Sequence, residues 1–238
     1  MLGAHHPLIK SVRKAVQRGG RTVEGLAVAE GPHLLHEALQ SGARIHAIIT
    51  VEPLDMPHHL VDAATMASLS SVESARGVIT LVDVPESPFD QMLEGNPLLV
   101  LLDGIQDPGN AGTILRSAEA FGATGVVFLK GSVNPCNPKV LRASAGSIFR
   151  IPFATMEWSE FATKDLTIYA AMPIGGIAPH KAQLDKPCAF VAGNEGSGVS
   201  NTILETARPI TIPTERVESL NAALATSILL YEAHRQRT

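Results

Sequence analysis

The sequence is poor in cysteine and lacks long apolar runs, and each shortage excludes a class of protein. The two cysteines, Cys136 and Cys188, lie far apart without a CxxC pair, so a disulfide framework is not expected and a reducing cytoplasm is compatible. Most of the nine histidines also lack the spacing of paired metal ligands, so we expect no metal. No apolar run approaches the roughly 20 residues that span a bilayer, and MLGAHHPLIK lacks the apolar core of a signal peptide. We therefore expect a cytoplasmic protein, neither membrane-bound nor secreted.

The chain also lacks an excess of positive charge. Its 19 Lys and Arg against 23 Asp and Glu give a formal net charge of -4. A protein that holds nucleic acid through a large overall positive field is thereby disfavoured, and any RNA site must be local. One basic stretch precedes the first acidic residue, Glu24, and it is either such a site or a solvated helix face. It consists of Lys10, Arg13, Lys14, Arg18 and Arg21.

The sequence does contain enough aliphatic residues to form a hydrophobic core. Hydrophobic residues make up 45% of the 238 and charged residues 18%, which is typical of a folded globule of one large or two modest domains. In the first part, PHLLHEALQ (residues 32–40) predicts a helix, while RIHAIITV (44–51) and SARGVITLVDVP (74–85) predict strands. The run VPESPFDQMLEGNP follows, rich in proline and without periodicity, and marks a domain boundary. We predict two domains, residues 1–90 and 91–238.

The second part predicts a parallel sheet covered by helices. Its short strands LLVLL, GVVFL, TIYAA and CAFVA are almost wholly apolar, as strands buried on both faces are, and helical stretches separate them. In this architecture ligands bind beyond the carboxyl ends of the strands. The fold class is therefore α/β, with a smaller α/β or α+β unit at the N-terminus.

Three segments at strand ends carry polar residues that could do chemistry. In LLDGIQDPGNAGTILRSAEAFGATGVVFLKG, Asn110 is a candidate helix cap, and Arg116 is either a surface charge or a phosphate clamp. FVAGNEGSGVS is a glycine-rich turn with one acidic residue, Glu195, and matches neither the dinucleotide nor the triphosphate fingerprint. ITIPTERVESLNAALATSILLYEAHRQR contains a short strand and then a long helix, for which Ser219 is a candidate cap, followed by Leu220 and Asn221.

These three segments, in this order, resemble the three motifs of the SpoU (TrmH-like) family of RNA 2′-O-ribose methyltransferases. The stretch NPKVLRASAGSIFRIP, with Arg142, Ser144 and Gly146, resembles the family's sequence between motifs one and two. The resemblance covers about Leu98 to Arg237. It implies a SPOUT-class fold with a C-terminal trefoil knot, S-adenosylmethionine as methyl donor, and a homodimer whose partner completes the active site.

The resemblance also assigns roles to residues. Those that match the donor site of the family are Gly193, Gly196, Ile212, Leu220 and Asn221. Those that match the polar groups around the reacting ribose, and so are the expected catalytic set, are Asn110, Arg116, Glu195 and Ser219. Motif three departs from the family, because the loop after Pro213 lacks the usual glycine and is one residue shorter.

The N-terminal part resembles, more loosely, the ribosomal-protein-L30e-like substrate-binding domain that is often fused to these enzymes. This resemblance implies that Lys10, Arg13 and Lys14 meet RNA phosphates, and we expect Arg142 to bind RNA as well. Ribosomal RNA is favoured over transfer RNA as substrate. The alternatives are a tRNA methyltransferase, an RNA-binding or ribosome-assembly protein with a vestigial methyltransferase site, and an enzyme using a nucleotide cofactor, for which no phosphate-binding fingerprint is present.

Overall fold

The computed structural model describes residues 1–70, 77–161 and 165–238, and its chain divides into two compact units. Unit 1 comprises Met1–Pro85 and Asn134–Arg150, and unit 2 comprises Glu86–Val133 and Ile151–Thr238. The segment Asn134–Arg150 thus interrupts unit 2 in sequence and packs with unit 1. The division into domains of residues 1–90 and 91–238 stays a prediction.

Unit 1 is built on a four-stranded sheet in the order β1-β4-β2-β3. The central strand β4 (Val78–Val82) is antiparallel to β1 (Ala27–Glu30) and β2 (Ile45–Thr50), and β2 is parallel to β3 (His59–Leu60). The helices are α1 (Pro7–Gln17), α2 (Pro32–Gln40), α3 (Ala63–Ala67) and α6 (Pro138–Ser144), with a 3-10 turn η1 (Ser147–Phe149). The expected helix 32–40 and both expected strands are confirmed, except that residues 74–76 of the second strand's segment lie outside the described residues.

The segment that carries α6 is fitted closely to the rest of unit 1. Gly20 adopts a φ of 100°, and a Cβ there would overlap the backbone carbonyl of Cys136, so only glycine allows this approach. The Arg150 guanidinium donates to the Glu37 carboxylate at 2.7 Å. These contacts explain why a stretch that follows unit 2 elements in sequence belongs to unit 1.

One buried hydroxyl in unit 1 has no hydrogen-bond partner among the described residues. Thr80 on β4 is fully buried, and its Oγ1 makes no hydrogen bond to any described residue. A buried hydroxyl without a partner costs roughly 1–3 kcal/mol. We therefore expect Thr80→Val to raise the free energy of unfolding by about 1 kcal/mol, measured by urea or thermal denaturation.

Thr50 provides the matched control for this change. It is as buried as Thr80, but its Oγ1 donates to the Glu52 carbonyl at 2.8 Å and accepts from the Glu52 amide at 3.1 Å. Thr50→Val is therefore expected to lower stability by about 1 kcal/mol. Equal destabilisation by both substitutions would show that the Thr80 hydroxyl is satisfied in solution.

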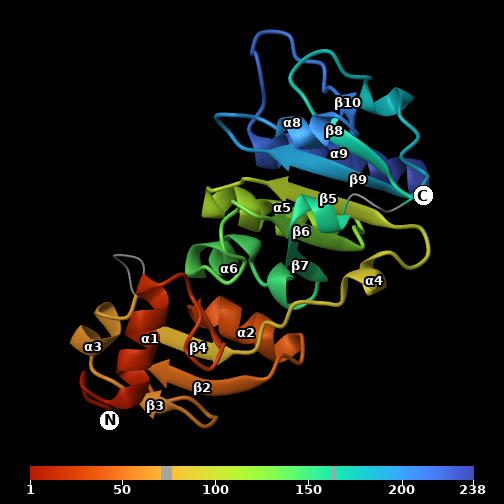
Figure 1. The fold of residues 1–238 in the computed structure, drawn as a ribbon. Coiled ribbons are helices and arrows are strands. Elements are labelled where there is room, and N and C mark those ends of the chain that lie inside the picture. The colour runs from red at the N-terminus through yellow and green to blue at the C-terminus, as the bar shows by residue number, and fades with distance from the viewer. Residues whose placement is uncertain (71–76, 162–164) are drawn as a thin grey trace. The chain divides into compact units, whose positions relative to one another are not determined.

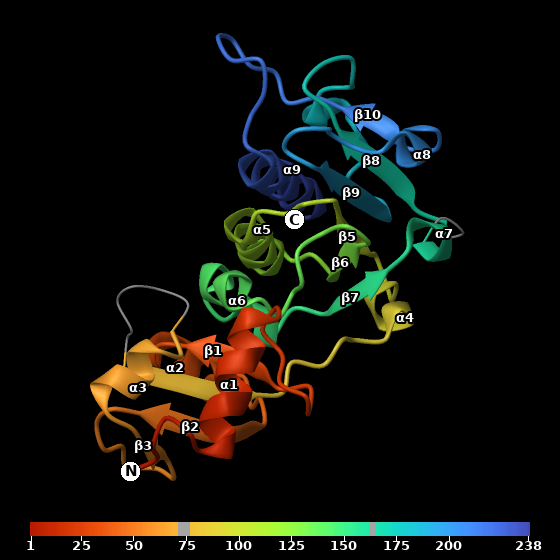
Figure 2. The same cartoon turned by 60° about the vertical axis from the view of Figure 1, so that its left-hand side comes forward.

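Unit 2 is a six-stranded, wholly parallel sheet in the order β10-β8-β9-β5-β6-β7. The strands are β5 (Leu98–Asp103), β6 (Gly125–Leu129), β7 (Phe153–Met156), β8 (Thr167–Ala171), β9 (Cys188–Gly193) and β10 (Arg208–Ile210). Helices α5 (Pro108–Ala120) and α9 (Ala222–Arg237) cover one face. The short helices α4 (Phe89–Met92), α7 (Trp158–Phe161) and α8 (Asn201–Leu204) lie on the other, as Figures 1 and 2 show, and a 3-10 turn, η2 (Pro179–Lys181), precedes β9.

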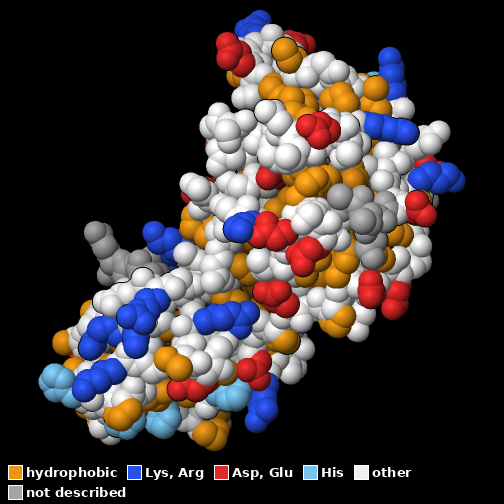
Figure 3. All heavy atoms as spheres, in the orientation of Figure 1, with side chains coloured by type: hydrophobic (Ala, Val, Ile, Leu, Met, Phe, Trp, Pro, Cys, Tyr) orange, Lys and Arg blue, Asp and Glu red, His pale blue; other side chains and the backbone are white. Residues whose placement is uncertain are grey.

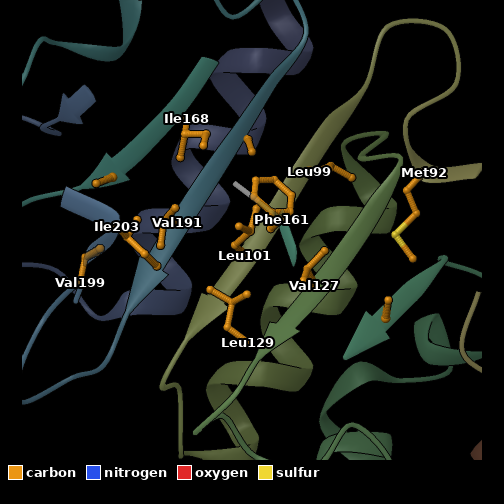
Figure 4. Packing of buried hydrophobic residues seen from close by; sticks show 13 residues of the cluster. Met92, Leu99, Leu101, Val127, Leu129, Phe161, Ile168, Val191, Val199 and Ile203 are labelled. Atoms are coloured by element: carbon orange, nitrogen blue, oxygen red, sulfur yellow. The ribbon is translucent and has the colours of Figure 1, made fainter. Parts of the chain in front are cut away.

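The two-sided cover explains the apolar strands. Leu99 and Leu101 of β5 point to the same side as Val191 of β9, where they meet Phe161 and Ile203 from the short helices (Figure 4). The alternate residues of the same strands, such as Val100 and Phe190, are equally buried on the opposite face. The expected parallel sheet covered by helices is confirmed, and the four expected strands are β5, β6, β8 and β9.

Helices α5 and α9 lie side by side and run in the same direction. Three contacts follow one another along both helices: Asn110 with Asn221, Ser117 Oγ with Ser227 Oγ at 2.7 Å, and Phe121 with Tyr231 at 5.7 Å between ring centroids. The two helix N-termini therefore lie at the same end of unit 2. No helix among the described residues is both long and apolar enough to cross a membrane.

Two expected helix caps were wrong. The N-cap of α5 is Asp107, whose carboxylate accepts from the Asn110 amide at 2.8 Å, and Asn110 lies inside the first turn. The N-cap of α9 is Asn221 in place of Ser219, and its Oδ1 accepts from the amides of Ala223 and Leu224. Both asparagines lie at helix N-termini, but only Asn221 is a cap, and the sequence pattern did not show this difference.

Candidate active site

A cavity of about 590 Å³ opens at the carboxyl ends of three neighbouring strands of unit 2. Its walls come from the residues that directly follow β8, β9 and β10, and from the first turns of α9. Parallel pairing brings these strand ends together, since Ile210 of β10 pairs with Ala171 of β8, and β8 pairs with β9. This is the edge where parallel α/β sheets bind their ligands, and the volume suits a small organic molecule.

A chain of hydrogen bonds joins the three motif segments beside this cavity. Asn221 Nδ2 donates to Asn110 Oδ1 at 3.0 Å, and Asn110 Nδ2 donates to Glu195 Oε1 at 2.6 Å. The donor and acceptor roles in this series of hydrogen bonds are fixed by Asn221. Its Oδ1 already accepts from the α9 amides, so only its NH₂ group can face Asn110. This series of hydrogen bonds therefore fixes one carboxylate oxygen of Glu195 at the cavity.

The loop after β9 carries Glu195 and is closed on itself. The amide of Gly198 donates to the Asn194 carbonyl at 2.9 Å, and the Asn194 amide donates to the Gly198 carbonyl at 3.0 Å. A Cβ on Gly193 would overlap the backbone of Gly198 and Val199, so glycine is required there for the loop to fold back. Gly193 is therefore needed for the fold of this loop, whether or not it also contacts the donor as predicted.

Most of the predicted site residues meet at this cavity. Those that line it are Gly193, Glu195, Gly196, Ile212, Ser219, Leu220 and Asn221. Asn110 joins them through its hydrogen bonds to Glu195 and Asn221. The shortened loop after Pro213 also contributes Thr214 and Glu218 to the wall. Segments separated by more than a hundred residues are thus brought together as the motifs predicted.

Arg116 is the exception. It lies two turns along α5 from the helix entrance, is exposed, and is not among the residues that line the cavity. Within the described parts of the chain its guanidinium makes no hydrogen bond or ion pair. The structure of one chain therefore does not bring Arg116 to the other predicted catalytic residues.

The predicted RNA-binding residues of α1 share one side of that helix. Lys10, Arg13 and Lys14 are spaced as neighbours on a helix surface, opposite the buried Ile9, Val12 and Ala15. Figure 3 shows Lys and Arg side chains gathered over the part of unit 1 that carries α1.

Some of the other basic residues of unit 1 have structural partners. Arg21 donates to the carbonyls of Gly25 and Val84. Arg142 pairs with Glu30 at 3.5 Å. Lys10 and Lys14 of α1 make no such contact within the described residues and are exposed, as are Arg18, Arg44 and Lys139.

Comparisons with known proteins agree with this geometry. Residues 97–231 match the model of the SpoU rRNA Methylase family. The chain belongs to the SpoU rRNA Methylase family. Residues 6–89 match the MRM3-like substrate binding domain, which confirms the expected fusion of a substrate-binding domain to the methyltransferase. The identification of the enzyme class from its three motifs is confirmed.

Individual SpoU relatives span nearly the whole chain. An uncharacterized tRNA/rRNA methyltransferase of Synechocystis sp. is 33% identical, with 98% of this chain and 92% of the relative covered. The 23S rRNA (guanosine(2553)-2′-O)-methyltransferase RlmP of Bacillus subtilis is 30% identical, with 96% of both covered. The AdoMet-bound rRNA methyltransferase of Sinorhizobium meliloti has the same fold, with a TM-score of 0.86, 26% identity, and 99% and 97% of the two chains covered.

The cavity residues fit S-adenosylmethionine, which the family uses. The cavity walls combine apolar side chains, such as Met172, Ile212 and Leu220, with the exposed backbone of the loop after β9. Apolar walls suit an adenine ring, while backbone amides and carbonyls suit its polar edge and the ribose. The carboxylates of Glu195 and Glu218, also in the wall, complement a sulfonium cation. Size, polarity and charge therefore all agree with this donor.

Proposed function

We propose that this chain is an S-adenosylmethionine-dependent RNA 2′-O-ribose methyltransferase that acts on ribosomal RNA in the cytoplasm. The observation that carries the proposal is the hydrogen-bonded chain Asn221–Asn110–Glu195 at the rim of a donor-sized cavity. Two relatives support the finer points, since RlmP methylates a guanosine 2′-O position of 23S rRNA and the S. meliloti structure is of an AdoMet-bound rRNA methyltransferase. The trefoil knot of the SPOUT class is part of the same proposal.

When bound, S-adenosylmethionine supplies an already activated methyl group on sulfur. The chain's own task is to place a weakly acidic ribose hydroxyl in line with that group, and positioning contributes most of the rate. Glu195 Oε1 is held by Asn110, and Oε2 makes no hydrogen bond within the described residues, so it is available to accept one from the ribose 2′-hydroxyl. Ser219, in the cavity wall, supplies a further hydroxyl near the reacting atoms.

Arg116 acts as phosphate clamp and electrostatic stabiliser of the developing alkoxide. An arginine guanidinium keeps its proton in proteins and so is not a practical proton acceptor, whereas its fixed charge and fork of donors suit phosphate. Because Arg116 lies outside the cavity of its own chain, this role requires that RNA or a second copy of the chain covers that side of α5. The unpaired state of its guanidinium among the described residues is consistent with an external partner.

We propose a homodimer, and the exposed side of α9 supports it. Leu224, Ile228 and Tyr231 are spaced at one helical face and are 57%, 42% and 55% exposed. Three large apolar side chains in one stripe beside the active site are typical of an interface. A mass of twice 25.1 kDa in light scattering, reduced to one copy by Tyr231→Asp, would support the dimer.

The RNA-binding surface is the basic side of α1. Lys10, Arg13 and Lys14 would neutralise phosphates, with Arg142 as a further contact that must share its charge with Glu30. Sequence-independent phosphate contacts of this kind position the substrate and leave the choice of nucleotide to unit 2.

The test is transfer of labelled methyl from S-adenosylmethionine to ribosomal RNA and transfer RNA in separate reactions, together with calorimetric measurement of donor binding. Label in ribosomal RNA alone is the expected result, and label in transfer RNA alone would correct the substrate class. Donor binding without transfer to either RNA would support the vestigial-site alternative. Absence of donor binding would contradict the methyltransferase proposal itself.

A further inference from the structure

The side chain of Asn194, the residue before Glu195, makes hydrogen bonds both within its own loop and to a different segment. Its Oδ1 accepts from the amides of Gly196 and Ser197 at 2.9 and 3.1 Å, and from the Ser197 hydroxyl at 3.3 Å. Its Nδ2 donates to the carbonyl of Gly104 at 2.7 Å. One amide side chain therefore both shapes the loop and ties it to another segment.

The other segment is the connection that leads into α5. Gly104 directly follows β5, has a φ of 70°, and stands three residues before Asp107, the N-cap of the helix that carries Asn110. A Cβ at Gly104 would lie only 3.6 Å from the Asn194 Cβ, so the two segments are already in close approach. The Asn194–Gly104 bond thus fixes the Glu195 loop relative to the start of α5.

We infer that Asn194 is a positioning residue for methyl transfer, which holds Glu195 at hydrogen-bonding distance from Asn110. The two ends of the amide have separate tasks. The oxygen organises the turn through residues 196 and 197, and the NH₂ group sets where that turn lies. The inference rests on the proposed function, because it assigns Asn194 a part in aligning the carboxylate that faces the ribose.

Aspartate separates the two tasks. Asn194→Asp keeps an oxygen for the amides of Gly196 and Ser197 but places a carboxylate oxygen against the Gly104 carbonyl, where the NH₂ group had donated. We expect it to fold and to bind S-adenosylmethionine, while kcat for methyl transfer falls about 10²-fold, the cost of misplacing a reacting group by about 1 Å. Asn201→Ala, the same residue type exposed at the start of α8, is the control and should leave kcat unchanged.

The deciding measurement is a double-mutant cycle with Glu195→Gln, in which kcat, KM for RNA and donor Kd are determined for the two single variants and the double variant. If Asn194 acts through Glu195, adding Asn194→Asp to Glu195→Gln should change kcat by no more than about twofold. Multiplicative effects on kcat, or a loss confined to donor Kd, would overturn the positioning role while leaving the proposed function in place. No methyl transfer by the unmodified enzyme would overturn the proposed function, and the role of Asn194 with it.

Discussion

Arg116→Ala is expected to lower kcat for methyl transfer by about 10²–10³-fold, the usual effect of removing one preorganised charge stabiliser from a transition state. Arg116→Lys should keep part of the activity, because a lysine retains the charge but not the bidentate geometry. Donor binding should be unchanged in both variants, since Arg116 does not line the cavity. Single-turnover methyl transfer with calorimetric Kd values for the donor measures both expectations.

The control for this prediction is another exposed cation of unit 2. Lys181, in the turn η2, is exposed and does not line the cavity, so Lys181→Ala should keep normal turnover. Equal and nearly complete loss of kcat in Arg116→Ala and Arg116→Lys would contradict the electrostatic role. Normal turnover in Arg116→Ala would remove Arg116 from the catalytic set.

Arg237→Ala is expected to lower the free energy of unfolding of unit 2 by about 3 kcal/mol, because four backbone carbonyls, two of them part-buried, would lose a charged donor together. The Arg237 side chain, near the end of α9, donates to four backbone carbonyls. These are Leu184 at 2.7 Å, Asn96 at 2.7 Å, Pro97 at 3.1 Å and Lys186 at 2.7 Å. It thereby joins α9 to the segments that precede β5 and β9. Thermal and urea denaturation measure the loss.

Arg235 is the matched control for Arg237, two residues earlier in the same helix. Its guanidinium pairs with Glu232 on the surface, at 2.9 and 2.7 Å, and exposed pairs contribute about 1 kcal/mol or less. Arg235→Ala should therefore cost at most about 1 kcal/mol. Similar losses in both variants would show that the carbonyl contacts of Arg237 are not stabilising.

A thiol beside Arg237 reports on the same region. Burial raises the pKa of Cys188, and Arg237 only partly offsets that shift, so the thiol is protonated and unreactive in the folded protein. In Arg237→Ala we expect faster reaction of Cys188 with a thiol reagent as the surrounding segments open locally. An unchanged rate of Cys188 modification would show that the segments around Cys188 do not open in Arg237→Ala.

Much of the fold could be predicted from apolar runs, and the reason is the two-sided cover of the sheet. Strands such as β5 and β9 are buried on both faces and so read as continuous hydrophobic stretches. The edge strand β10 has two exposed residues, and the two-residue strand β3 is too short for any periodicity. Propensity also could not assign Asn134–Arg150 to unit 1, because the close fit at Gly20 involves a backbone carbonyl far away in sequence.

The sequence predicted most residues of the candidate site but not all of their roles. Motif resemblance named Asn110, Glu195 and Asn221, and the structure joins them in one hydrogen-bonded chain. It did not single out Asn194, although an asparagine beside a glycine-rich turn is a residue whose side chain commonly organises that turn. The caps were misassigned because Asp107 and Asn221 compete with nearby Asn110 and Ser219 for the same task, and only the backbone geometry decides between such neighbours.

The most direct test of the central claim is the position of the transferred methyl group on the RNA. Ribosomal RNA labelled by the purified enzyme would be digested to nucleosides and analysed by mass spectrometry, with Glu195→Gln in parallel. The site described above predicts a ribose 2′-O-methyl nucleoside whose yield falls strongly in the variant. A methyl group on a base, or an undiminished 2′-O-methyl yield from Glu195→Gln, would contradict the account.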